Sequence, residues 1–195
     1  MINNYLGTKD NKNYKFATLD EKEILNIVNK YPSERKSSAV IPLLHYVQKK
    51  AGGWLPVPEI ERVADILGMS YMRVYEVASF YTMFNLKPVG KFLLQVCKTT
   101  PCWLRGSDDV EKCIKDILKI SNGETTKDGL FSLMEVECLG ACVNAPVLQI
   151  NDDYYEDLNY ESTKKLLNKF QDNKQPKPGS SLGRKSSEPI NFRKR

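Results

Sequence analysis

Four of the five cysteines in this 195-residue chain form two close pairs. Cys97 and Cys102 have the spacing C-x4-C, and Cys138 and Cys142, after 35 intervening residues, have the spacing C-x3-C. Thiolate sulfur is a soft ligand, and four cysteines without a partner histidine favour zinc or an iron–sulfur centre over ions that prefer oxygen. The pattern therefore predicts a metal centre with four cysteine ligands.

The residues around the cysteines favour iron–sulfur. The two loops read TTPCWLRG and ECLGACVNAP, and their apolar side chains would shield a centre from water: Pro101, Trp103, Leu139, Ala141, Val143 and Pro146. Gly106 and Gly140 would allow backbone amides to approach the sulfur atoms, and such hydrogen bonds tune the potential of a cluster. Zinc remains an alternative because its documented spacings reach C-x4-C. Disulfides or a redox dithiol are a further alternative, although neither pair has the C-x-x-C spacing of such a dithiol.

Five phrases of the chain together resemble one protein family. They are GGWLP at 52–56, ASFYTMFN at 78–85, TTPCWLRG at 99–106, ECLGACVNAP at 137–146 and DDYYEDL at 152–158. The family is that of the 24 kDa subunit of the respiratory NADH:quinone oxidoreductase (complex I), which is a thioredoxin-like 2Fe-2S ferredoxin. The resemblance runs from about residue 18 to about residue 170.

This resemblance implies a cofactor and partners. Residue by residue, it makes Cys97, Cys102, Cys138 and Cys142 the ligands of one 2Fe-2S cluster. It implies an electron-transfer subunit whose cluster exchanges single electrons with the FMN of an adjacent 51 kDa flavoprotein subunit, where NADH is oxidised. A neighbouring iron–sulfur subunit would be a second partner, and this chain alone would hold no complete active site.

Two other functions stay open from the residues. The same module resembles the diaphorase subunits of NAD-linked hydrogenases and formate dehydrogenases, which differ in their partners. A metal centre that never changes redox state would instead have a purely structural role, which is to stabilise the fold of an interaction module. The chain has neither a G-x-G-x-x-G fingerprint nor a P-loop, so its sequence signals no nucleotide site of its own.

Periodicity predicts how the chain positions the cysteines. Helices are expected at 20–30, 37–50, 57–67 and 70–84, followed by a strand at 91–96, a helix at 108–120, strands near 131–136, 147–150 and 153–156, and a helix near 160–170. Cys113 falls on the apolar stripe of helix 108–120 and is expected in the core. This order is compatible with an α+β or α/β chain in which a helical bundle precedes the thioredoxin-like 2Fe-2S domain that the resemblance implies.

The expected organisation has four parts. A flexible N-terminus at 1–17 precedes the helical bundle at 18–88, the 2Fe-2S domain at 89–170 and a basic tail rich in Pro, Gly and Ser at 171–195. The tail carries seven basic and two acidic residues, which equals the net charge of +5 of the whole chain. Its composition indicates disorder, or an extended strap on an acidic partner surface.

The same features argue against nucleic acid and membrane binding. The phrase ADILGMS resembles a helix–turn–helix, but helix 70–84 carries one base, Arg73, beside Glu76, so it lacks the charge that a DNA-reading helix needs. The longest apolar runs are far shorter than the roughly 20 residues of a membrane span. The N-terminus has no arginine before Arg35 and contains several acidic residues, whereas a mitochondrial presequence would be rich in arginine and poor in acids. We therefore expect a peripheral subunit on the cytoplasmic side of a bacterial inner membrane, or on the matrix side of a mitochondrial one.

Positive charge beside the cysteines would assist reduction. A 2Fe-2S centre with four thiolates changes its formal charge from −2 to −3 when it accepts an electron, so burial opposes that step. Lys98 and Arg105 flank the first pair in the sequence. We expect them to stabilise the reduced state.

Overall fold

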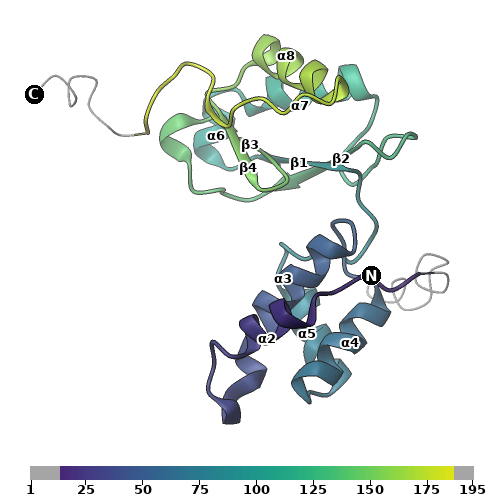
Figure 1. Cartoon of the computed structure of the whole chain (residues 1–195). Helices are drawn as coiled ribbons and strands as arrows, with labels where there is room; N and C mark the ends of the chain where they lie inside the picture. The colour runs from purple at the N-terminus through teal and green to yellow at the C-terminus, as the bar shows by residue number, and fades with distance from the viewer. Residues whose placement is uncertain (1–13, 187–195) are drawn as a thin grey trace, which may run out of the picture. The chain divides into compact units, whose positions relative to one another are not determined.

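The computed structural model describes residues 14–186, and the chain divides into two compact units, Met1–Val89 and Gly90–Arg195 (Figure 1). Each unit has its own hydrophobic core. Within the described residues, no helix is both long and apolar enough to cross a membrane.

The first unit is helical. Its elements are α2 (Glu21–Val28), the 3-10 helix η1 (Ser33–Ala39), α3 (Val40–Lys50), α4 (Val57–Leu67) and α5 (Tyr71–Phe80). Asp20 caps α2 by accepting a hydrogen bond from the backbone N–H of Lys22 at 2.9 Å. The apolar stripe of α3 is fully buried at Leu43, Leu44 and Val47, as its spacing predicts. The four predicted helices are therefore present, with a 3-10 segment at the start of the second.

The turn between α4 and α5 follows the sequence prediction in part. Gly68 ends α4 in the left-handed conformation with φ of 64°, which glycine adopts without strain. Ser70 is the N-cap residue of α5, but its side chain accepts no capping hydrogen bond. Helix α5 also ends at Phe80 rather than residue 84, because Tyr81 is extended. The following loop is tied to α3 by the N–H of Asn85, which donates to Gln48 Oε1 at 2.7 Å.

The second unit is built on a five-stranded sheet. Its strands are β1 (Phe92–Cys97), β2 (Phe131–Val136), β3 (Leu148–Ile150), β4 (Asp153–Glu156) and β5 (Gly179–Ser180), in the spatial order β2-β1-β3-β4-β5. Strand β1 runs parallel to β2 and antiparallel to β3, and β4 runs antiparallel to β3 and parallel to β5. The helices are α6 (Thr100–Leu104), α7 (Ser107–Leu118) and α8 (Tyr160–Gln171), with a 3-10 turn η2 (Cys142–Asn144).

Helices α7 and α8 lie together over one face of this sheet (Figure 1). Alternate strand residues such as Leu94, Val96 and Leu133 are fully buried in the core that they form with these helices. Cys113 of α7 is fully buried, which confirms that it belongs to the core. The mixture of helices and sheet agrees with the predicted fold class.

The C-terminal tail differs from the prediction as far as it is described. Residues 179–180 form strand β5 on β4, and the segment continues along the domain to Ser186. The composition of the tail indicated disorder because it has few apolar residues, but its polar side chains make the contacts instead. The remainder of the tail and residues 1–13 of the N-terminus lie outside the described residues.

Candidate metal centre

The two cysteine-bearing loops leave the sheet at the same edge. Strands β1 and β2 are parallel neighbours, and Cys97, the last residue of β1, is in register with Val136, the last residue of β2. The carboxyl ends of parallel strands meet on one side of a sheet. Cys102 follows on the short helix α6, and Cys138 and Cys142 follow β2. The topology thus brings the two pairs together, as the strand-and-loop pattern predicts.

Sulfur contacts join the cysteines in pairs. Cys138 Sγ lies 3.2 Å from Cys142 Sγ, and Cys97 shares a thiol hydrogen bond with Cys102. Cys97 also interacts electrostatically with Cys138 and Cys142, and Cys142 interacts electrostatically with Cys102. All four thiols are free, so none is held in a disulfide. The sulfurs therefore share one electrostatic neighbourhood.

The paired arrangement suits a two-iron centre. A structural zinc ion needs four ligands that meet at one point, whereas a 2Fe-2S cluster divides its four ligands between two irons. Two pairs of thiols in one neighbourhood fit the second requirement better.

The two pairs differ in burial. Cys97 and Cys102 are each only 1% exposed, in a small apolar cluster with Ala145 and Val147. Cys138 is exposed and Cys142 is half-buried. The first pair is thus held by the core, and the second pair by a surface loop.

Some of the predicted shielding residues cover the cysteines and others do not. Leu139 and Ala141 pack against the apolar cluster of the first pair, and Pro146 is buried. Trp103 and Val143, by contrast, are 56% and 49% exposed. Pro101 is exposed as well, because it is at the N-terminal end of helix α6. The prediction that these three residues shield the centre is therefore wrong for this chain alone.

Backbone amides do reach the sulfur atoms. The N–H of Gly140, a residue with φ of 80°, donates to Cys138 Sγ at 3.4 Å. Backbone N–H groups of Thr99 and Leu139 also bond Cys97. Gly106 has a different role from the one expected, because its φ of 98° makes it the residue that begins helix α7. Donors to sulfur are the feature that stabilises thiolate ligands.

Each pair contains one thiol that ionises easily and one that resists ionisation. Burial raises the pKa of Cys97, but hydrogen bonds from Thr99 outweigh it and lower that pKa overall. Burial and the hydrogen bond to Cys97 raise the pKa of Cys102 to about 12. In the second pair, the Gly140 N–H lowers the pKa of Cys138, and the bond to Cys138 raises that of Cys142. Once one thiolate of a pair forms, the other sulfur keeps its proton.

Comparison with known proteins identifies the family. The model of the thioredoxin-like [2Fe-2S] ferredoxin family matches residues 24–171. The chain belongs to that family.

Relatives within the family are similar over most of the chain. An NADH-quinone oxidoreductase subunit of Rickettsia bellii is 64% identical over 145 residues, which cover 74% of this chain and 87% of that protein. The mitochondrial NADH dehydrogenase [ubiquinone] flavoprotein 2 of Dictyostelium discoideum is 46% identical over 190 residues, covering 96% of this chain and 77% of that protein. These matches bear out the resemblance to the 24 kDa subunit family drawn from the five sequence phrases.

A solved structure supports the fold. A NAD+-reducing [NiFe]-hydrogenase in the air-oxidised state superimposes with a TM-score of 0.60 at 19% identity, over 69% of this chain and 23% of that chain. At this identity the match is informative for the fold alone.

The positive charges expected beside this ferredoxin's cysteines are arranged differently. Lys98 turns to helix α7, where its Nζ is 2.8 Å from Glu111 Oε2 and also pairs with Asp108. Lys115 pairs with the same Glu111. Lys98 is therefore not a free cation at the centre. Arg105 is exposed at the end of α6.

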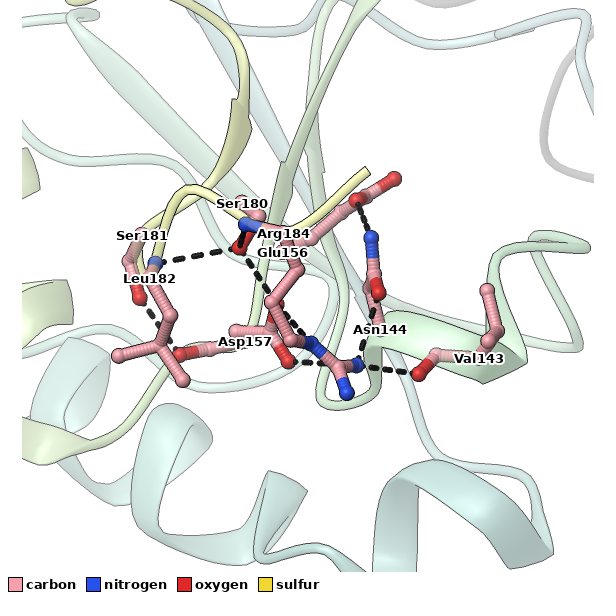
Figure 2. A network of polar contacts seen from close by, with 8 residues as sticks. All are labelled: Val143, Asn144, Glu156, Asp157, Ser180, Ser181, Leu182 and Arg184. Atoms are coloured by element: carbon pink, nitrogen blue, oxygen red, sulfur yellow. Dashed lines mark hydrogen bonds and ion pairs between the residues drawn. The ribbon is translucent and has the colours of Figure 1, made fainter. Parts of the chain in front are cut away.

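Sequence reasoning missed one group of residues near the second pair. Arg184, Asp157 and Asn144 form a polar network around the turn that carries Cys142 (Figure 2). Asn144 and Asp157 lie within phrases that carried the family resemblance, but nothing in the periodicity marks them. Arg184 is one of several bases in the tail, so its sequence position alone could not identify it.

Proposed function

We propose that this chain is the electron-transfer subunit of an NADH:quinone oxidoreductase, with one 2Fe-2S cluster held by Cys97, Cys102, Cys138 and Cys142. The observation that carries the proposal is that four free thiols leave one edge of the sheet in two pairs. A bound 2Fe-2S cluster supplies one-electron redox chemistry.

The chain's own residues prepare this site in three ways. Cys97 and Cys138 have lowered pKa values, so each pair offers one sulfur that is readily deprotonated for iron. The Gly140 N–H and the Thr99 side chain contact these same sulfurs and hold their orientation. Ala145 and Val147 exclude water from the first pair.

The proposed electron partner is the FMN of the NADH-oxidising 51 kDa flavoprotein subunit. We also propose contact with a neighbouring iron–sulfur subunit and a location on the cytoplasmic or matrix side of the membrane. These assignments rest on the resemblance to the 24 kDa subunit family, and relatives that are 46% to 64% identical are named as subunits of NADH-quinone oxidoreductase or of a mitochondrial NADH dehydrogenase. The hydrogenase of similar fold keeps a diaphorase role as the second candidate, and the much higher identity of the respiratory relatives favours the first.

The deciding experiment is spectroscopy of protein purified without oxygen. We expect a brown protein with two irons and two acid-labile sulfides per chain, and a rhombic EPR signal that appears only after reduction with dithionite. Variants with serine at each of the four cysteines should lose this content, and Cys113→Ser should keep it, because Cys113 is buried in the core of α7. A colourless protein with one zinc would contradict the proposal and make the centre structural.

The flavoprotein assignment has its own test. Reconstitution with the 51 kDa subunit and NADH should produce the same reduced EPR signal without dithionite. A cluster that responds to dithionite but never to NADH and the flavoprotein would contradict the electron partner while leaving the ligand assignment in place.

A further inference from the structure

The C-terminal segment, residues 179–186, folds back onto the loop that carries Cys142. Strand β5 pairs with β4 in parallel, and the chain beyond it brings Arg184 to the 3-10 turn η2. Figure 2 shows the arginine side chain extended between Asp157 and that turn.

Arg184 makes contacts on both sides of its guanidinium. Its Nε donates to Asp157 Oδ2 at 3.1 Å, and its Nη2 lies 3.0 Å from Asp157 Oδ1. The same Nη2 donates to Asn144 Oδ1 at 2.7 Å and to the carbonyl oxygen of Val143. The two residues directly after Cys142 are therefore fixed to one planar cation, whose fork geometry a lysine cannot reproduce.

Asp157 fixes the position of that cation. Its side chain is 1% exposed, whereas that of Arg184 is 43% exposed. Ser180 Oγ of strand β5 donates to Asp157 Oδ2 at 2.6 Å, and the Asp157 N–H donates to the Asn144 carbonyl at 2.7 Å. A buried carboxylate requires a partner charge, so the position of Arg184 is strongly constrained.

The second cysteine pair needs such support more than the first. Cys97 and Cys102 are buried against the core, but Cys138 is exposed and Cys142 begins a turn of only three residues. Apart from Arg184, the side chain of Asn144 is held by Glu156, whose Oε2 accepts from Nδ2 at 2.6 Å. The C-terminal segment thus supplies rigidity that the sheet does not.

We propose that Arg184 is a positioning residue of the metal centre, acting through Val143 and Asn144 to hold Cys142 in the geometry that retains iron. This inference rests on the proposed function, since it assumes that Cys142 is a ligand. It assigns the basic tail a role within this chain, distinct from binding to an acidic partner.

The test compares Arg184→Gln and Arg184→Lys with the wild-type full-length chain. Lys177→Gln serves as the matched control, because it removes one charge from an exposed position of the same tail. Two quantities are measured: amide hydrogen exchange of residues 139–147 in the metal-free protein, and the rate of iron release to a chelator from the iron-loaded protein. We expect R184Q to exchange faster in that segment and to release iron about tenfold faster, in line with the loss of metal affinity that follows removal of a residue supporting a metal ligand. R184K should lie between R184Q and the wild type, and K177Q should match the wild type.

The possible results distinguish the positioning role of Arg184 from the proposed 2Fe-2S function of the chain. Unchanged iron release in an iron-loaded R184Q protein would overturn the positioning role, even if the C-terminal segment became more mobile. If R184Q does not fold, the R184K protein decides in the same way, because it keeps the charge beside Asp157 and loses the simultaneous bonds to the turn. A wild-type chain without iron and sulfide would instead contradict the proposed function itself.

Discussion

At the residue scale, the cysteine pairs are asymmetric in their ionisation. Cys138 is exposed, and the Gly140 N–H lowers its pKa, whereas Cys102 is buried with a pKa of about 12. Cys113 lies outside the centre, and burial raises its pKa to about 11. The reactive form of a thiol is the thiolate, so these differences have a chemical consequence.

We expect the thiols of the metal-free, reduced chain to react with iodoacetamide in a fixed order. Cys138 should be alkylated first near neutral pH, because a lowered pKa places its thiolate at lower pH and its side chain is accessible. Cys102 and Cys113 should react last, since their thiolates form only in alkaline solution and both are buried. Mass spectrometry of the labelled peptides gives the order. Labelling of Cys102 as fast as Cys138 would contradict this account of the site.

A second residue-scale prediction concerns the charges that hold the loop after β1 to helix α7. Burial raises the pKa of Glu111, but hydrogen bonds from Lys115 and Lys98 outweigh it and lower that pKa. Glu111→Gln should reduce the free energy of unfolding by about 1–2 kcal/mol at pH 7, because Lys98 loses a charged and largely buried partner. Urea unfolding measures the change.

The pH dependence of the stability of E111Q tests whether the loss comes from the charge of Glu111. A carboxyl group with a lowered folded-state pKa stabilises the fold above its unfolded pKa, near 4.5, and loses this contribution as the pH falls through the lower folded value. The difference between wild type and E111Q should therefore disappear in acid. Glu76→Gln, which breaks the exposed pair with Arg73, should cost less than about 0.5 kcal/mol at any pH. An equal cost for the two variants would show that burial of the charge is unimportant.

At the element scale, the strands could be predicted from sequence because alternate residues of β1 and β2 enter the core that α7 and α8 cover. Helix α6 and strand β5 could not be predicted in this way. Helix α6 has five residues, too few for a helical period, although Pro101 stands where a helix can begin. Strand β5 has two residues and forms only because β4 offers a free edge. Contacts between distant segments, such as Arg184 with Asp157, leave no local pattern in a sequence.

The pairing of β1 with β2 depends on Gly90, two residues before the start of β1. A Cβ atom at this position would lie 2.8 Å from the Phe131 carbonyl carbon and 2.9 Å from its nitrogen, both backbone atoms. Gly90→Ala should therefore push the two strands apart and cost about 2 kcal/mol or more. Thermal unfolding measures the loss.

A control separates this clash from a lost hydrogen bond. The Gly90 N–H donates to Ser132 Oγ at 2.7 Å, and displacement of the strand would break that bond too. Ser132→Ala removes the acceptor without the clash and should cost about 1 kcal/mol. If G90A were no more destabilising than S132A, the close approach of the two backbones would not be the reason that position 90 requires glycine.

At the scale of the whole molecule, the chain divides its residues between two cores. The first core is made of residues before Gly90, such as Leu43 and Ile60, and the second of residues after it, such as Leu94 and Leu167. All four proposed cysteine ligands and Arg184 lie in the second unit. The residues proposed to hold the cluster are therefore all found from Gly90 onward in the sequence.

We expect a fragment of residues 88–195 to fold and to bind iron and sulfide in the same ratio as the full chain. Its visible and EPR spectra after reduction should match, because the groups that contact the sulfurs, including Thr99 and Gly140, are retained. The same fragment with Cys138→Ser is the control that lacks one proposed ligand and should remain without a stable cluster. A wild-type fragment that is folded by circular dichroism but holds no iron would show that the helical unit contributes to the centre, and would assign to that unit a role in cofactor binding that its own fold does not reveal.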